Sequence, residues 1–146
     1  MGIHSRFIGS GMHVIVLLLI THFIADFVLQ SREMGKKKSS DPGYLAAHLA
    51  VQFVAFFLVA AFINPDRAVW FAMINMAIHG VIDWNLWRFY KAYAYKAIKN
   101  NPKHPLLTGN PSEPWKYWED HWFYTTIGFD QLLHMLTLVL LAWSML

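Results

Sequence analysis

The sequence contains no cysteine and few charged residues, and each shortage excludes a class of protein. Without cysteine the chain forms no disulfide, holds no metal through thiolates and has no cysteine nucleophile. Charged residues make up 14% of the chain, whereas soluble domains carry about 25%. Hydrophobic residues make up 56% and aromatic residues 16%. This balance indicates that lipid, rather than water, surrounds much of the protein.

Four long apolar stretches each have the length of a membrane helix, about 20 residues at about 1.5 Å rise per residue. They predict transmembrane helices at about 12–30, 44–63, 68–87 and 127–146. A cleaved signal peptide is an alternative for the first stretch, but the polar residues in its last part are unlike a plain signal sequence. The sequence therefore predicts an all-α fold. Residues 1–146 form one integral membrane domain, an antiparallel four-helix bundle that runs up, down, up and down.

The predicted connections place most basic residues on one side of this bundle. Residues 31–43 form a charged loop, and residues 88–126 form a long connection whose first part continues the third helix. Ten of the twelve Lys and Arg residues lie in these two connections. By the positive-inside rule, both connections are predicted to be cytoplasmic and both termini to lie outside.

Each predicted helix carries polar residues in a short row, mostly four residues apart and therefore on one face. The rows are His22, Asp26 and Gln30; His48 and Gln52; Asn75, His79 and Asp83; and Asp130 and His134 with Gln131 beside them. His precedes Asp in the first and third predicted helices, but Asp precedes His in the last. Because the last helix is predicted to run in the opposite direction, this reversal places like residues at the same depth in the bundle. The rows are therefore predicted to meet in one polar cluster, with carboxylates and His48 about 6 Å deep and the other three histidines about 12 Å deep.

Such a cluster is typical of a metal site. A charged side chain in hydrocarbon costs about 2.5–3.5 kcal/mol, so these groups must face inward and find partners. Neutral imidazoles and carboxylates are ligands for zinc, manganese and iron, and helical bundles build such sites. A ring of three histidines with one open position would be a catalytic zinc arrangement. The predicted metal ligands are His22, His48, His79, His134, Asp26, Asp83 and Asp130.

The same pattern predicts the role of each group. The cofactor is a divalent transition metal, with zinc first and manganese or iron as alternatives. Asp26, Asp83 and Asp130 are the candidate catalytic residues, because a carboxylate beside a metal can accept the proton of bound water. Four amides are expected to hydrogen-bond to the ligands: Gln30, Gln52, Asn75 and Gln131. A metal-free polar network is the alternative.

The polar positions also carry a family resemblance. "HFIADFVLQ" (22–30), His48, "HGVID" (79–83) and "FDQLLH" (129–134) together resemble the small bacterial and phage membrane proteins grouped as domain of unknown function 3307. That resemblance implies the bacterial inner membrane as the location, and it implies no activity. A looser similarity is to inner-membrane metal-dependent hydrolases, which also set His and Asp in short helical bundles, and this similarity favours hydrolysis.

Two classes of function remain open. The first is a metal-dependent hydrolase acting on a lipid or an amphiphilic ester or phosphoester, with residues 89–125 covering the site and supplying positive charge. The second is a non-catalytic membrane protein whose polar cluster fixes helix packing or partner assembly. Ion or proton transport is disfavoured because the outer halves of the helices are almost wholly apolar.

The expected partners follow from the same residues. They are the lipid bilayer and an anionic lipid or amphiphilic substrate. Nucleic-acid binding is disfavoured, since the Trp and Tyr residues of 84–95 and 115–124 fit an aromatic belt at the membrane interface.

Overall fold

The computed structural model describes residues 3–101, 107 and 116–146, with side chains from residue 11 onward. The long helices are α1 (Ile3–Phe23), α3 (Pro42–Ile63), α4 (Ala68–Asn100) and α5 (His121–Met145). Three short elements separate them: the π-helix η1 (Ile24–Val28), α2 (Arg32–Lys37) and the 3₁₀ turn η2 (Tyr117–Glu119). All seven elements are helical, as the sequence predicts. Residues 89–125 were predicted to cover the site, and part of this segment lies outside the described residues.

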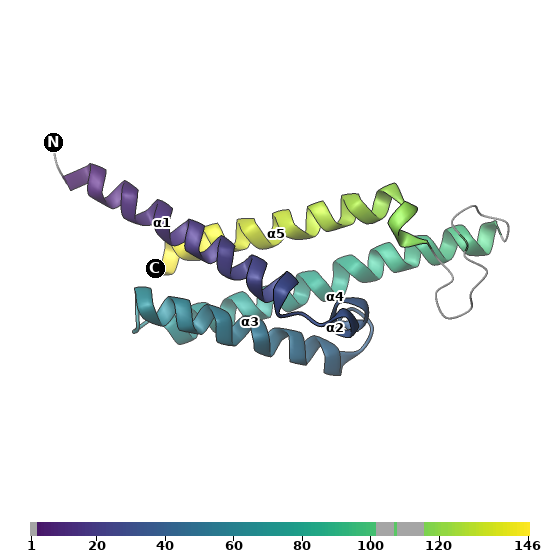
Figure 1. Ribbon diagram of the computed structural model, residues 1–146, viewed down its shortest axis with the longest axis horizontal. Coiled ribbons are helices and arrows are strands. Elements are labelled where there is room, and N and C mark those ends of the chain that lie inside the picture. Colours follow the sequence, from purple (N-terminus) through teal and green to yellow (C-terminus); the bar gives the residue numbers. More distant parts are fainter. Residues whose placement is uncertain (1–2, 102–106, 108–115) are drawn as a thin grey trace.

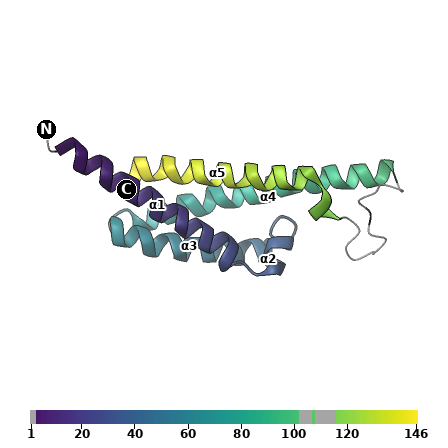
Figure 2. The ribbon, with the colours of Figure 1, turned by 45° about the horizontal axis from the view of Figure 1, so that its top comes forward.

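The four long helices lie alongside one another and alternate in direction. In Figure 1, α1 and α4 run towards the right, whereas α3 and α5 return towards the left. Helix α3 packs against α4, α4 packs against α5, and α1 contacts both α3 and α5. Figure 2 shows that α4 extends beyond its neighbours at the end that carries α2. We call this end the basic end, because it carries the connections 31–43 and 88–126.

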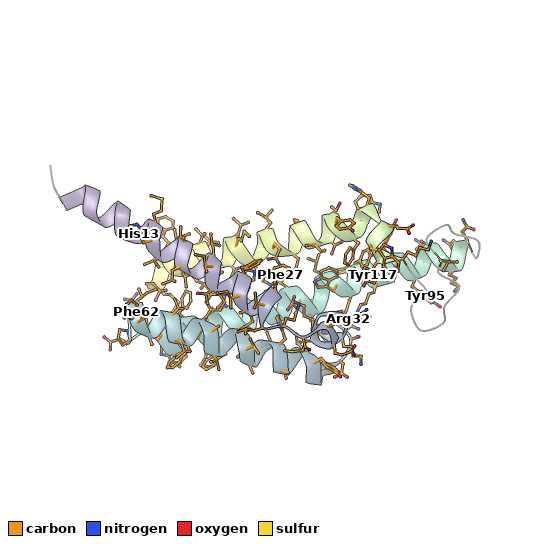
Figure 3. The ribbon with its side chains drawn as sticks, viewed as in Figure 1. His13, Phe27, Arg32, Phe62, Tyr95 and Tyr117 are labelled. Atoms are coloured by element: carbon orange, nitrogen blue, oxygen red, sulfur yellow. The ribbon has the colours of Figure 1, made fainter. Side chains whose placement is uncertain are left out.

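Three helices are long and apolar enough to cross a membrane: α1 with η1 from Gly11 to Val28, α3 and α5. They indicate that the protein associates with a membrane. The predicted third span, 68–87, lies within α4, which is not one of the three. Large apolar side chains also cover the outside of the molecule. Phe62 and Trp143 are each 89% exposed, and Figure 3 shows Phe62 near the end opposite α2.

Two boundaries differ from the sequence prediction because of local hydrogen bonds. The first predicted helix does not continue regularly to residue 30, since it widens into η1, where the N–H of Leu29 donates to the Ile24 carbonyl at 2.9 Å. The last helix begins at His121 rather than 127, because the Asp120 carboxylate accepts the N–H of Trp122 at 3.0 Å and caps it. Such a cap satisfies one of the free N–H groups at a helix start.

A third difference lies in the connection 31–43, which was expected to be a loop and contains α2. The hydroxyl of Ser31 accepts the N–H of Met34 at 3.2 Å, and the Lys37 ammonium lies 2.7 Å from the Glu33 carboxylate one turn away. The cap and the ion pair both favour a short helix here.

The buried face of each helix is one continuous stripe that is polar towards the basic end and apolar beyond it. On α3 the stripe is His48, Gln52, Phe56 and Ala60, and on α5 it is Asp130, His134, Leu138 and Ala142. The apolar parts meet in a core that also includes Leu18 and Phe71. Phe56 packs edge-to-face on Phe71, with ring centroids 6.3 Å apart. The apolar core therefore closes the helices directly beneath the polar cluster.

Truncating the buried ring of this core is expected to destabilise the protein. Phe56 is fully buried, so Phe56→Ala leaves a cavity and should cost on the order of 3 kcal/mol. Phe62→Ala on the same helix removes an exposed ring and should change little. Thermal unfolding in detergent, followed by circular dichroism, measures both variants. Equal melting temperatures for Phe56→Ala and Phe62→Ala would contradict the burial of Phe56 in this core.

Candidate functional site

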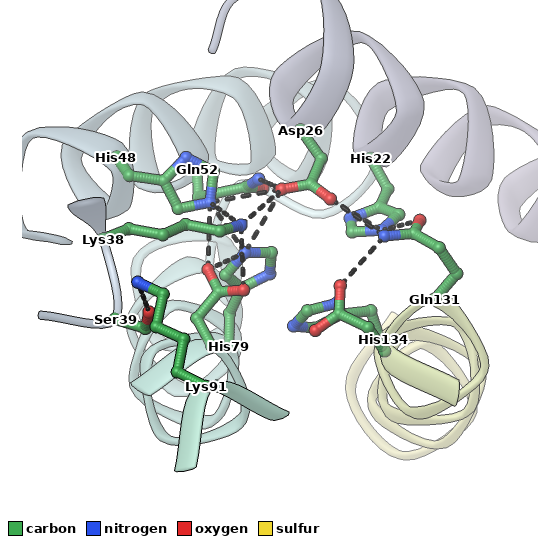
Figure 4. A network of polar contacts seen from close by, with 12 residues as sticks. His22, Asp26, Lys38, Ser39, His48, Gln52, His79, Lys91, Gln131 and His134 are labelled. Carbon is green, nitrogen blue, oxygen red and sulfur yellow. Dashed lines mark hydrogen bonds and ion pairs between the residues drawn. The ribbon is translucent and has the colours of Figure 1, made fainter. Parts of the chain in front are cut away.

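The polar rows meet in one buried cluster, shown in Figure 4. Its histidines and carboxylates are each no more than 3% exposed. They come from α1, η1, α3, α4 and α5 and comprise His22, Asp26, His48, His79, Asp83, Asp130 and His134. The seven predicted metal ligands therefore lie together.

The centre of the cluster is a group of four residues, which we call the central group: Asp26, His48, His79 and Asp83. The two Nε2 atoms of His48 and His79 lie 3.0 Å apart. The Oδ2 atom of Asp83 lies 3.1 Å from His48 Nε2 and 3.2 Å from His79 Nε2. The Oδ1 atom of Asp26 lies 3.2 Å from the first nitrogen and 3.7 Å from the second.

These separations match those of ligand atoms around a metal. Zinc in a tetrahedral site has ligand bonds of about 2.0–2.1 Å, which places the ligand atoms about 3.3 Å from one another. The five separations in the central group range from 3.0 to 3.7 Å. The donor set of two imidazoles and two carboxylates also suits a divalent transition metal. The central group could therefore hold one metal ion.

Two further groups of neighbouring ligand atoms adjoin the central group. One comprises His22, Asp26 and His134, and the other comprises Asp83, Asp130 and His134. Because Asp26 and Asp83 also belong to the central group, either carboxylate could bridge to a second ion. The predicted ring of three histidines is not among these groups. His79 and His134 stack face to face with ring centroids 3.9 Å apart, so their ring faces, rather than their nitrogens, are turned to each other.

Lys38 is a member of the cluster that sequence analysis missed. Lys38 is 5% exposed, and its ammonium lies 2.8 Å from Asp83 Oδ1 and 3.4 Å from Asp26 Oδ1. Burial opposes the charged ammonium, but the carboxylates of Asp83 and Asp26 outweigh it, so the pKa of Lys38 is raised above its usual value. Lys38 therefore supplies a fixed positive charge beside the central group.

The segment after α2 brings Lys38 into this position. The Lys91 ammonium on α4 donates to the Lys36 carbonyl at 3.0 Å and to the Ser39 hydroxyl at 2.8 Å. Both contacts hold the segment against α4 on either side of Lys38. In the sequence, Lys38 is the third of three consecutive lysines, and only the end of α2 at Lys37 distinguishes it. The sequence alone therefore gives no signal that singles it out.

Buried charge in the cluster is unbalanced. The carboxylates of Asp26, Asp83 and Asp130 are buried, whereas Lys38 is the one buried lysine or arginine among the residues whose side chains are described. With neutral histidines and all three carboxylates ionised, two negative charges are left without a buried counter-ion, and unpaired charges in an apolar interior are strongly unfavourable. A divalent cation would neutralise both.

Gln131 and Gln52, two of the four predicted amides, donate hydrogen bonds to carboxylates of the cluster. Gln131 donates to Asp26 Oδ2 at 3.0 Å and to Asp130 Oδ2 at 3.2 Å, and its Oε1 lies 3.1 Å from His22 Nε2. Gln52 donates to Asp26 Oδ1 at 3.5 Å. Gln30 lines a small cavity with Asp26 and Asp130. Asn75 is buried, but its Nδ2 has no partner among the described residues.

Comparisons with known proteins give one match. The model of a family described as "Protein of unknown function (DUF3307)" matches residues 14–146, which include every residue of the cluster. Neither the curated proteins nor the solved structures give a match.

Removing the ammonium of Lys38 is expected to destabilise the metal-free protein. Lys38→Met leaves Asp26 and Asp83 facing each other without their counter-ion, and breaking a buried pair of this kind costs about 3–5 kcal/mol. Added Zn²⁺ should restore much of the loss, because the cation takes over the compensation. Thermal unfolding with a chelator and with zinc measures both effects.

The adjacent Lys37→Met variant is the control, since the Lys37 side chain is 48% exposed and contacts Glu33 and the Tyr44 ring at the surface. It should melt like the wild type under both conditions. If Lys38→Met and Lys37→Met melted at the same temperature, Lys38 would not be the counter-ion that stabilises the buried carboxylates.

Proposed function

Because the chain belongs to a family of proteins of unknown function, DUF3307, we propose its function from the site alone: a membrane-embedded, metal-dependent hydrolase of lipid or amphiphilic esters or phosphoesters. The observation that carries this proposal is the central group, in which four ligand atoms from three helical elements converge at the separations of a tetrahedral metal shell. The excess of buried negative charge supports a cation at the same place.

The proposed membrane arrangement follows from the stripe on each helix. Helix α4 turns Asn75, His79 and Asp83 inward, where they are buried. Its outer face carries apolar side chains such as Trp70 and Val81. This supports α4 as a fourth membrane span beside α1, α3 and α5, in an antiparallel four-helix bundle. The excess of Lys and Arg then favours a basic end in the cytoplasm of a bacterial cell and a site just below the inner-membrane surface.

Each part of the cluster has a role in the proposed reaction. A divalent metal held by the central group would lower the pKa of bound water and polarise the ester. Asp130 is the proposed general base: its Oδ1 has no partner among the described residues, and it adjoins the central group through Asp83. The water oxygen attacks the ester carbon or phosphorus, its proton passes to Asp130, and the bond to the leaving oxygen breaks. The same proton then passes to that oxygen.

Lys38 contributes electrostatically. Its ammonium is fixed beside the central group, so it would attract an anionic substrate and stabilise the negative charge that develops on the attacked group. Such preorganised charge is effective because no reorganisation is needed during the reaction.

The second candidate function is a metal-free packing network. The observation that favours it is also Lys38, whose ammonium already compensates part of the carboxylate charge. In that case the cluster would specify how the helices associate, as polar groups do in membranes. Metal content separates the two functions.

Detergent-purified protein is expected to contain at least one equivalent of zinc, manganese or iron. His48→Ala and His79→Ala each remove a ligand of the central group and should lose the metal. His13→Ala, on the exposed face of α1, should retain it. Mass spectrometry of metal content measures all four proteins. A folded wild type that could not be loaded with zinc, manganese or iron would rule out the hydrolase.

Asp130→Asn is expected to keep the metal and lose activity. The amide cannot accept the proton of bound water, so the rate of hydrolysis should fall by about 10²–10⁴-fold. A chromogenic carboxylic ester and a short-chain phosphatidic acid serve as substrates. Asp66→Asn, in the exposed turn between α3 and α4, is the control. If Asp130→Asn hydrolysed these substrates at the wild-type rate, Asp130 would not be the general base.

A further inference from the structure

A second cavity adjoins the buried polar cluster at the basic end. It has a volume of about 500 Å³, within the range of pockets that bind small molecules. Aromatic side chains form much of its wall, including Trp87, Tyr117 and Phe123. Figure 3 shows Tyr117 and Arg32 at this end of the molecule.

The charged residues among the described lining of this cavity are all basic. Three basic residues, Arg32, Lys36 and Lys91, contribute to the wall, and none of its described lining residues is acidic. Lys91 is partly buried here, and burial lowers its pKa. A lining of aromatic rings and positive charge fits a ligand that combines an apolar part with an anionic group.

The cavity leads towards the central group. A smaller cavity of about 130 Å³ is lined by Asp26, Lys38 and Asp130, among others. Gly35 and Trp87 line both cavities, so the two adjoin at these residues. Gly35 also allows Gln30 to approach closely, because a Cβ atom at this position would lie only 3.1 Å from Gln30 Nε2.

Trp87, which lines both cavities, carries a hydrogen-bond donor with no partner among the described residues. This donor, the indole Nε1, is buried. The ring itself is held by Tyr90 and Phe123, with centroids 6.2 and 5.8 Å away. A buried N–H without an acceptor is costly, whereas a bound anion would satisfy it.

We propose that this cavity binds a phosphate-bearing amphiphile, with the phosphate near the Trp87 N–H and the basic residues and the apolar part along the aromatic wall. A ligand held there has its phosphoester beside Lys38, Asp130 and the central group. The inference rests on the proposed function in naming this amphiphile as the substrate, but binding to the cavity can be measured without turnover.

The test uses hexylphosphonate, an anionic amphiphile whose carbon–phosphorus bond resists hydrolysis. Isothermal titration of the full chain in a maltoside detergent measures its affinity, beside methylphosphonate and hexanol as the anionic and apolar parts alone. Hexylphosphonate should bind at least tenfold more tightly than methylphosphonate, and hexanol should not bind detectably. The metal content of the same samples is measured in parallel.

Two variants locate the binding. Trp87→Phe removes the N–H and keeps an aromatic ring, and Arg32→Gln removes one charge from the wall. Each should weaken hexylphosphonate binding by about tenfold, as expected for one lost hydrogen bond or contact to a charged group. Lys96→Gln, exposed on α4 outside the cavity lining, should bind as the wild type does.

Three results would overturn the proposal: no binding of hexylphosphonate, equal binding of methylphosphonate, or equal binding by the wild type and both cavity variants. A weakening by Lys96→Gln as large as that of the cavity variants would also overturn it, since the attraction would then be non-specific. Because metal content is measured separately, a metal-loaded protein that binds no phosphonate contradicts this inference alone. A phosphonate-binding protein that takes up no metal contradicts the hydrolase alone.

Discussion

The burial of three carboxylates among packed helices is the constraint on which the rest of this structure depends. Asp26, Asp83 and Asp130 are each no more than 3% exposed. Their charge requires compensation from inside the protein. The position of Lys38, the amide of Gln131 and the convergence of imidazoles on the central group all serve that requirement. The segment after α2 is held against α4 for the same reason.

Much of the cluster could be predicted from the sequence, because it depends on spacing along helices. The reversed order of Asp130 and His134 predicted that the last helix is antiparallel to its neighbours and that the groups meet, and the structure brings them together. The all-α class follows from the same apolar lengths. These features need only the helical repeat and the cost of polar groups in lipid.

The remaining features depend on three-dimensional contacts that no spacing encodes. Lys38 was part of a predicted charged loop, and its burial depends on α2 and the contacts of Lys91. The π-helix η1, which contains Asp26, forms through a hydrogen bond that the sequence does not mark. His22, His79 and His134 shared a predicted depth, but the rings of His79 and His134 stack face to face, and the three do not form one ligand group.

The continuous stripe on α3 and α5 has a consequence for which changes in length the chain can tolerate. His48, Gln52, Phe56 and Ala60 occupy one face, so the polar site and the apolar core share a single register. Deleting one residue between Gln52 and Phe56 would rotate everything beyond it by about 100°. Either the polar cluster residues or the core side chains would then face outward. Insertions and deletions within these helices should therefore be far rarer in evolution than substitutions, and the site and the fold should be inherited or lost together.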